Sequence, residues 1–192
     1  VTAFELDSRM SPNYGVNRVC SNFLKHQSTC TSGTATANPT VALWGDSFSM
    51  HIVQALQQSR TKAKFVSQSL ITCNPIEGIA PKNKANGMSG AKNCNKVNSA
   101  FMAYLMSSKA KSSIRTVILA SHWENILLNG KTTLDSRQVL SQDSQKPRAA
   151  LQATISKLRN AGYRVVVISS PAYTETNSGQ CLRTAILKRK SL

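Results

Sequence analysis

Residues 41–52 read VALWGDSFSMHI, an apolar run that stops at Gly45-Asp46-Ser47 and changes at once to a helical pattern. The apolar side chains of the second half recur at helical spacing, at Phe48, Ile52, Val53 and Leu56. We therefore predict a strand over residues 40–44 and a helix over residues 48–59. The Ser47 hydroxyl then lies where the strand passes into the helix. A serine in that position can act as a nucleophile beside the first helix amides, but Asp and Ser are also common helix N-caps.

The rest of the chain alternates between apolar runs and amphipathic segments. Further strands are predicted over 63–67, 115–120 and 163–169, and further helices over 96–107, 147–160 and 181–190. Residues 70–93 are rich in Gly, Pro, Asn and Lys and are predicted to form a long loop. Continuous Val/Ile strands separated by helices predict an α/β fold of three layers, in which helices cover both faces of a mostly parallel sheet.

Polar side chains follow three of the predicted strands. Asp46 and Ser47 follow the first strand, Ser69 follows the second, and Ser121-His122-Trp123-Glu124-Asn125 follows RTVILA. Ligands of open α/β sheets bind outside the carboxyl ends of the strands. Three polar groups at that edge favour a nucleophile site over a purely structural cap.

Five cysteines bear on the cellular compartment. Cys20 and Cys30 bracket a short polar loop, and Cys73 and Cys94 bracket a longer one. We predict two disulfides and hence an oxidising compartment, and free thiols in a cytosolic protein are the alternative. Cys181 has no partner in this scheme. The chain has no C-x-x-C pair and no His at zinc-ligand spacing, which argues against a metal site.

Length and charge narrow the class of protein. The 192 residues suit a single domain with its own core. The net charge of +16 favours acidic partners such as phosphorylated or carboxylated glycans, although a solvated basic face is an equal alternative. Aromatic residues make up only 6%, and no nucleic-acid-binding motif is present, which argues against nucleic acid. No apolar run reaches the ~18 residues of a membrane span, and no secretory signal opens the sequence. We expect any export or membrane segments to lie outside this chain.

These residues resemble the SGNH/GDSL hydrolase superfamily, and most of all the periplasmic SGNH domains attached to membrane acyltransferase-3 proteins, which O-acetylate bacterial surface glycans. TVALWGDSFSMHI matches the first family block, RTVILASHWENI lies where the third falls, and the TCNPIEG loop lies between them. The resemblance implies a flavodoxin-like α/β/α fold over residues 39–192. Residues 1–38 are polar, rich in Ser, Thr and Asn and weakly periodic, and we predict that they form an irregular segment stapled by a Cys20–Cys30 disulfide. It also implies no cofactor, a periplasmic site tethered to the inner membrane by a fused or neighbouring transmembrane acyltransferase domain, and an acetylated or acceptor glycan as partner.

The resemblance assigns serine-dependent O-acyl transfer or ester hydrolysis, with Ser47 as nucleophile and its own amide in the oxyanion hole. Candidate oxyanion or substrate-binding residues are Asp46, Ser69, His122, Trp123 and Asn125. The family's Asp-x-x-His block, which supplies the general base, is absent, because His26, His51 and His122 all lack an Asp three positions earlier. We expect that this block, with the end of the SGNH-like domain, lies beyond this chain. The alternative is a non-catalytic basic module that binds glycan for a separate membrane acyltransferase.

Overall fold

The computed structural model describes residues 31–32, 38–58, 64–82, 87–127, 133–135, 138–140, 145–170 and 184. The account below concerns the compact unit within residues 14–170. Its strands are β1 (Thr31–Ser32), β2 (Val41–Gly45), β3 (Phe65–Ser69), β4 (Ile79–Pro81), β5 (Thr116–Ala120), β6 (Thr133–Asp135), β7 (Gln138–Leu140) and β8 (Arg164–Ile168). Its helices are α3 (Ser47–Gln58), α4 (Gly87–Met106), α5 (Ser108–Ser113), α6 (Glu124–Leu127) and α7 (Gln145–Asn160).

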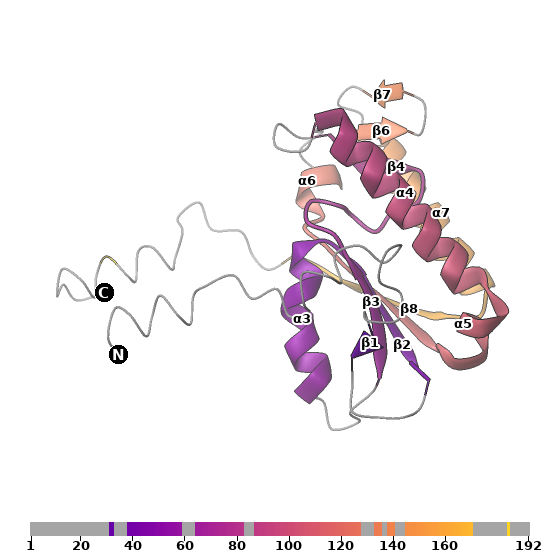
Figure 1. Cartoon of the computed structure of the whole chain (residues 1–192). Helices are drawn as coiled ribbons and strands as arrows, with labels where there is room; N and C mark the ends of the chain where they lie inside the picture. The colour runs from indigo at the N-terminus through magenta and orange to yellow at the C-terminus, as the bar shows by residue number, and fades with distance from the viewer. Residues whose placement is uncertain are drawn as a thin grey trace. The chain divides into compact units, whose positions relative to one another are not determined.

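The main sheet has the strand order β1-β3-β2-β5-β8, and its last four strands run parallel (Figure 1). Only β1 is antiparallel, paired with β3. The register places Gly45 beside Ser69 on one side and beside Ala120 on the other, and Ala120 beside Ile168. The carboxyl ends of all four parallel strands therefore meet along one edge, and the predicted mostly parallel sheet is confirmed.

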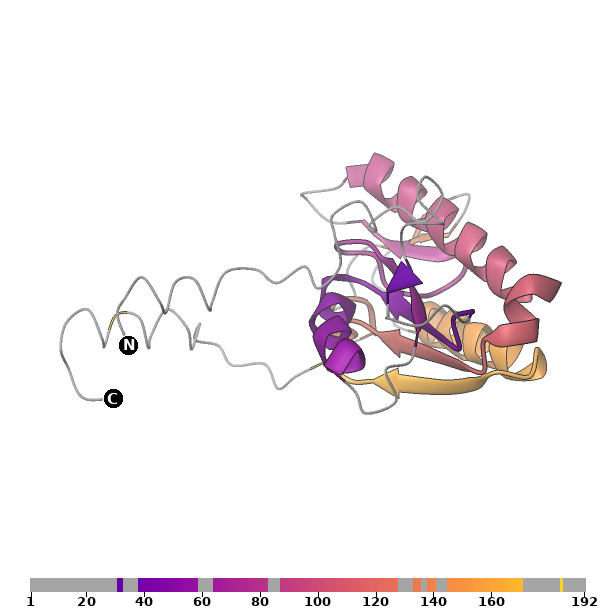
Figure 2. The same ribbon diagram turned by 60° about the horizontal axis from the view of Figure 1, so that its bottom comes forward.

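Helices cover the two faces of this sheet, α3 on one and α4 with α7 on the other (Figures 1 and 2). The alternation of side chains along β2 explains the arrangement. Leu43 packs with Val53 of α3, whereas Trp44 joins the cluster that contains Phe101 of α4 and Leu158 of α7. The predicted three-layer α/β fold is confirmed.

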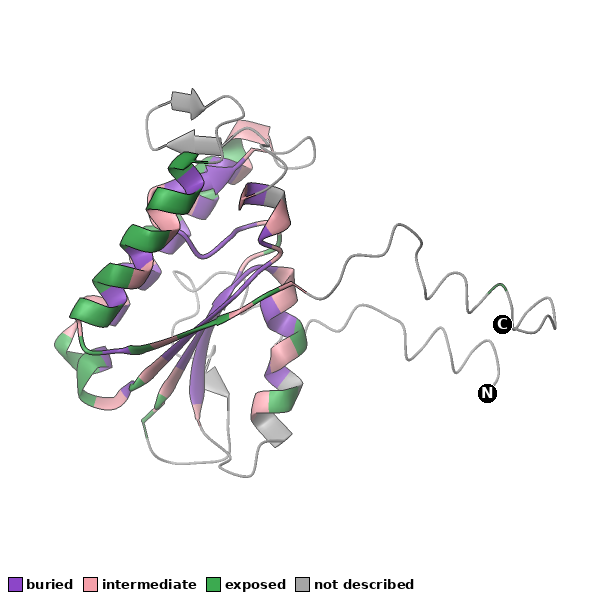
Figure 3. Ribbon diagram, turned by 180° about the vertical axis from the view of Figure 1, so that it is seen from behind, coloured by how far each residue is buried: buried purple, intermediate pink, exposed green. Residues whose placement is uncertain are grey.

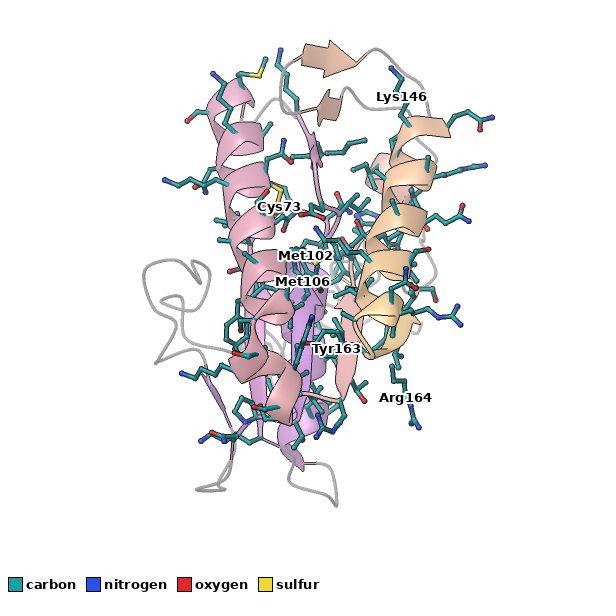
Figure 4. All side chains as sticks on the ribbon, turned by 90° about the vertical axis from the view of Figure 1, so that its right-hand side faces the viewer. Cys73, Met102, Met106, Lys146, Tyr163 and Arg164 are labelled. Atoms are coloured by element: carbon teal, nitrogen blue, oxygen red, sulfur yellow. A yellow bond between two sulfur atoms is a disulfide. The ribbon has the colours of Figure 1, made fainter. Side chains whose placement is uncertain are left out.

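Tyr163, which directly precedes β8, packs in the hydrophobic cluster between α4 and α7. Figure 4 shows Met102, Met106 and Tyr163 between the two helices, with Lys146 and Arg164 pointing away from them. The Tyr163 hydroxyl donates a hydrogen bond to the Leu105 carbonyl oxygen of α4. Burial raises the pKa of Tyr163, and the nearby Tyr104 raises it further, against the opposing charge of Arg115.

The edge strand β8 is the exception to two-sided coverage. The central strands are buried, but the side chains of Val166 and Val167 are 38% and 47% exposed (Figure 3). An unbroken valine run is typical of a central parallel strand, so the sequence did not indicate an edge position. Of the helix predicted over residues 181–190, the structure describes residue 184 alone, so this helix stays a prediction.

The prediction of a loop over residues 70–93 is wrong in its second half. The segment contains β4, which pairs with β6 of the separate β4-β6-β7 sheet, and α4 already begins at Gly87. Ala91 and Cys94 lie on the buried face of α4 and cluster with Cys73. Tertiary contacts of this kind outweigh the weak helix propensity of Gly and Asn.

The predicted Cys73–Cys94 disulfide is present and joins the loop after β3 to α4. The predicted Cys20–Cys30 pair lies outside the described residues. Among the helices of the described ranges, none is long and apolar enough to cross a bilayer. In that same part of the chain, no group of His, Cys, Asp or Glu side chains is placed to hold a metal ion.

Candidate active site

Ser47 is the first residue of α3 and lies at the shared edge where the parallel strands end. The backbone just before it is crowded. A Cβ atom on Gly45 would lie 1.8 Å from the Ala120 carbonyl oxygen and 2.7 Å from Ser49 Cβ. Only glycine allows β2, β5 and the start of α3 to approach so closely, and this approach sets the position of Ser47.

The buried carboxylate of Asp46 accepts three hydrogen bonds. The residue is 4% exposed. Its Oδ1 accepts a hydrogen bond from the Phe48 N–H at 2.9 Å, which caps α3. Its Oδ2 accepts from Ser121 Oγ at 2.7 Å and from the His122 N–H at 2.9 Å. The Asp46 side chain therefore fixes the start of α3 to the end of β5, and its carboxylate is turned into the protein rather than toward a ligand.

Ser47 differs from its neighbours in the surroundings of its hydroxyl. The residue is half-buried, and its Oγ has no hydrogen-bond partner among the described residues. The Phe48 N–H goes to Asp46 Oδ1, and the Ser49 N–H goes to the Asp46 carbonyl oxygen. The Ser47 N–H has no acceptor among the described residues, so it is the first amide of α3 that is available to an oxyanion.

Ser69 is fully buried and serves the packing of α3. Ser49 Oγ donates to the Asp46 carbonyl oxygen at 2.6 Å and lies 2.5 Å from Ser69 Oγ. This contact ties the first turn of α3 to the end of β3. The Ser69 hydroxyl, at 0% exposure, is not in a position to contact a substrate.

Two asparagines that the sequence analysis did not single out connect the strand ends. Asn74 Nδ2 donates to Ser121 Oγ at 2.7 Å and to the His122 carbonyl oxygen at 3.2 Å. Asn98 Nδ2 donates to the Asn74 carbonyl oxygen at 2.8 Å, and its Oδ1 accepts from Trp44 Nε1 at 2.9 Å. Two features of the sequence could have indicated these residues. Asn98 is a polar residue on the apolar face of a predicted helix, and Asn74 directly follows Cys73.

The loop after β3 also contains Thr72 at φ +59°. A β-branched residue in the left-handed region is an outlier that costs on the order of 1–3 kcal/mol. Outliers of this kind cluster at functional sites. Glycine would adopt the backbone conformation of Thr72, three residues beyond Ser69, without this strain.

His122 lies over α3 and beside Glu124. Its Nε2 is 3.0 Å from Glu124 Oε2. Its ring centroid is 4.9 Å from that of Phe48, and Phe48 in turn lies 5.8 Å from His51. Three rings thus follow one another beside the Ser47 backbone.

Trp123 is oriented away from these rings, toward the end of β8. Its indole Nε1 donates to the Ile168 carbonyl oxygen at 2.7 Å, and its N–H donates to Ser170 Oγ at 3.0 Å. Ser170 Oγ donates to the Ser121 carbonyl oxygen at 3.1 Å. Trp123 therefore anchors β8. Asn125 lies in α6, and its side chain is outside the described part.

The structure thus brings Asp46, Ser69 and His122 close to the start of α3, and directs Trp123 elsewhere. A cavity of about 430 Å³ lies between residues 77–79 and α7, and Ser47 is not among its lining residues. What remains at the sheet edge is the half-buried Ser47 at a helix N-terminus, next to the hydrogen-bonded Asp46. That arrangement suits nucleophilic attack on an acyl group.

Comparison with known proteins agrees with this geometry. No curated protein matches the chain. The family model described as the SGNH domain (fused to AT3 domains) matches residues 17–191, a range that contains the Gly45-Asp46-Ser47 turn and the whole parallel sheet. The chain therefore belongs to the family of SGNH domains that are fused to AT3 domains, a hydrolase- and acyltransferase-like family.

Proposed function

We propose that this domain carries out serine-dependent O-acyl (acetyl) transfer or ester hydrolysis on a bacterial surface glycan, with Ser47 as the nucleophile. The observation that carries the proposal is the contrast at the start of α3. Asp46 and Ser49 are buried and hydrogen-bonded, whereas Ser47 is half-buried and its hydroxyl has no hydrogen-bond partner among the described residues. A structural cap would be engaged, and a nucleophile must be available.

In this proposal Ser47 Oγ attacks the carbonyl carbon of the acetyl ester. The hydroxyl proton passes to a general base, which the family supplies from its Asp-x-x-His block. The Ser47 N–H, at the positive end of a helix of 12 residues, faces the oxyanion. The ester C–O bond then breaks, the sugar alcohol leaves with a proton, and water or a second sugar hydroxyl takes the acetyl group from Ser47.

We further propose that the domain works outside the cytoplasm beside a fused or neighbouring membrane acyltransferase. The family description names the AT3 fusion. The Cys73–Cys94 disulfide supports an oxidising compartment. The membrane domain would deliver the acyl group, and this domain would pass it to the glycan or remove it.

The test uses the full-length protein with Ser47→Ala. Acetyl release from p-nitrophenyl acetate and from an O-acetylated glycan should fall by on the order of 10³-fold or more, because no other group replaces the nucleophile. Ser89→Ala, an exposed serine-to-alanine change on α4, is the matched control and should keep full activity. Activity of the Ser47→Ala protein equal to the control would overturn the proposal.

A second candidate function is a basic module that positions an acidic polysaccharide without reacting with it. Among the described residues, the carboxylates of Asp46, Glu77 and Glu124 are all engaged, Glu77 with Lys157. Exposed cations on α4 and α5 remain, at Lys92, Lys96, Lys109 and Lys111. This function predicts that Ser47→Ala binds a carboxylated polysaccharide as well as wild type and that about 0.5 M salt weakens binding strongly.

A further inference from the structure

Phe48 is a large apolar residue that does not join the core. The hydrophobic clusters of the described residues include Val53, Ile52 and Leu56 of α3 but not Phe48. The inward position in the first turn is taken by Ser49, which is fully buried. Phe48 is half-buried and lies on the flank of α3, directly after Ser47. A phenyl ring left beside a reactive serine needs a partner other than the core.

Among the residues that the structure describes, two imidazoles contact the Phe48 ring. His51, exposed and one turn further along α3, stacks on Phe48 with 26° between the planes. His122, from the end of β5, lies against Phe48 at 35°. We call His51, Phe48 and His122 the ring row. It joins two strand ends of the site, and its middle ring belongs to the residue that follows Ser47.

A carboxylate, that of Glu124, adjoins the ring row at His122. His122 Nε2 contacts Glu124 Oε2, and the two side chains are 24% and 32% exposed. The carboxylate holds the imidazole in one orientation. Glu124 retains oxygen lone pairs that can accept hydrogen bonds from hydroxyl groups. Flat apolar surface next to a hydroxyl acceptor is the combination that a sugar ring matches, because a pyranose has an apolar C–H face and a polar rim.

We propose that the ring row is the sugar subsite of this domain, on which the pyranose that bears the acyl group packs its C–H face while Ser47 reaches the ester. This inference rests on the proposed function and specifies its substrate as a pyranoside ester. The subsite sets which esters bind well, whereas Ser47 performs the attack.

The experiment compares two esters on the full-length protein. An O-acetylated methyl glucopyranoside has a sugar face, and p-nitrophenyl acetate has none. For His51→Ala, the ratio of kcat/KM for the pyranoside to that for p-nitrophenyl acetate should fall about 3- to 10-fold, mainly through KM, since an aromatic contact contributes about 0.5–1.5 kcal/mol. His51→Tyr, which keeps a ring, should retain most of the ratio. Ala55→Ser, at an exposed position of the same helix, is the control and should change neither ester.

A second variant and a binding measurement keep the outcomes distinct. Phe48→Leu should lower the same ratio at least as much as His51→Ala. Titration calorimetry of the acetylated pyranoside into a Ser47→Ala protein should show the same order of affinities without any chemistry. If both ring variants keep the wild-type ratio and affinity, the subsite is wrong while Ser47 stays the nucleophile. If Ser47→Ala retains activity but the ring variants lose affinity, the proposed reaction fails and the subsite stands.

Discussion

At the scale of one residue, Gly45 is required in the Gly-Asp-Ser turn because no side chain fits at its position. We predict that Gly45→Ala destabilises the domain by about 3 kcal/mol or more, because the added methyl group meets the rigid Ala120 carbonyl oxygen at 1.8 Å. Urea unfolding measures the loss, with Ser89→Ala as a neutral control. If the Gly45→Ala protein unfolded at the same urea concentration as the control, β2 and β5 would not approach each other this closely.

Ser67 and Ser49 are buried serines with opposite surroundings, and they make a matched pair. Ser67 Oγ, on β3, has no hydrogen-bond partner in the described structure, whereas Ser49 Oγ contacts the Asp46 carbonyl oxygen and Ser69 Oγ. We predict that Ser67→Ala raises the free energy of unfolding by up to about 1 kcal/mol, since it removes an unpaired polar atom. Ser49→Ala should lower it by about 1–3 kcal/mol. Equal losses in the two variants would contradict this contrast.

At the scale of elements, the disulfide loop links the helix layer to the site. The Cys73–Cys94 bridge holds the segment that carries Asn74, which donates to Ser121, which in turn donates to Asp46. We predict that the double variant Cys73→Ala/Cys94→Ala is less stable by about 3 kcal/mol, as expected for closing a loop of 21 residues. Under the proposed function, the release of acetate from p-nitrophenyl acetate should fall as well, because the Asn74 contact loosens.

Reductant provides the control for the disulfide prediction. Dithiothreitol should lower the unfolding midpoint of the wild-type protein by more than that of the double variant, because only the wild-type protein loses the Cys73–Cys94 bridge, whereas the predicted Cys20–Cys30 bridge is common to both. Activity that survives reduction in full would show that the Asn74–Ser121–Asp46 chain does not depend on the bridge.

The same elements show how far sequence alone can predict this fold. The strand at residues 41–45 and the helix that follows were predicted within a residue or two, because the spacing of apolar residues and the choice of turn-forming residues depend on neighbouring positions in the sequence. The start of α4 was missed, since Gly87 and Gly90 suggest a loop, and the contacts of Ala91 and Cys94 that make it a helix come from elsewhere in the chain. For the site, the position of Ser47 followed from the strand-to-helix pattern. The left-handed Thr72 and the orientation of Phe48 depend on packing that no local pattern reveals.

At the scale of the whole molecule, Tyr163 connects the sheet to the layer of α4 and α7, and it makes stability depend on alkaline pH. Burial raises its pKa above the ordinary value of about 10, and burial also raises that of Tyr104. The folded state therefore favours the neutral phenol. The resulting stabilisation is fully present below the unfolded pKa of about 10 and is lost as pH rises through the folded value.

Lysine deprotonation changes the +16 net charge over the same pH range, so the test of this linkage compares two proteins rather than one. At about pH 8, Tyr163→Phe should be less stable than wild type by about 1 kcal/mol, because it loses the hydrogen bond to the Leu105 carbonyl oxygen. Between about pH 10 and pH 11 the difference in stability should shrink. In this range the Tyr163 phenol of the wild-type protein loses its proton on unfolding, which favours the unfolded state, and Tyr163→Phe has no such proton. Urea unfolding of both proteins across this range measures the difference. A gap that stays constant with pH would show that the Tyr163 phenol titrates alike in the folded and unfolded chains.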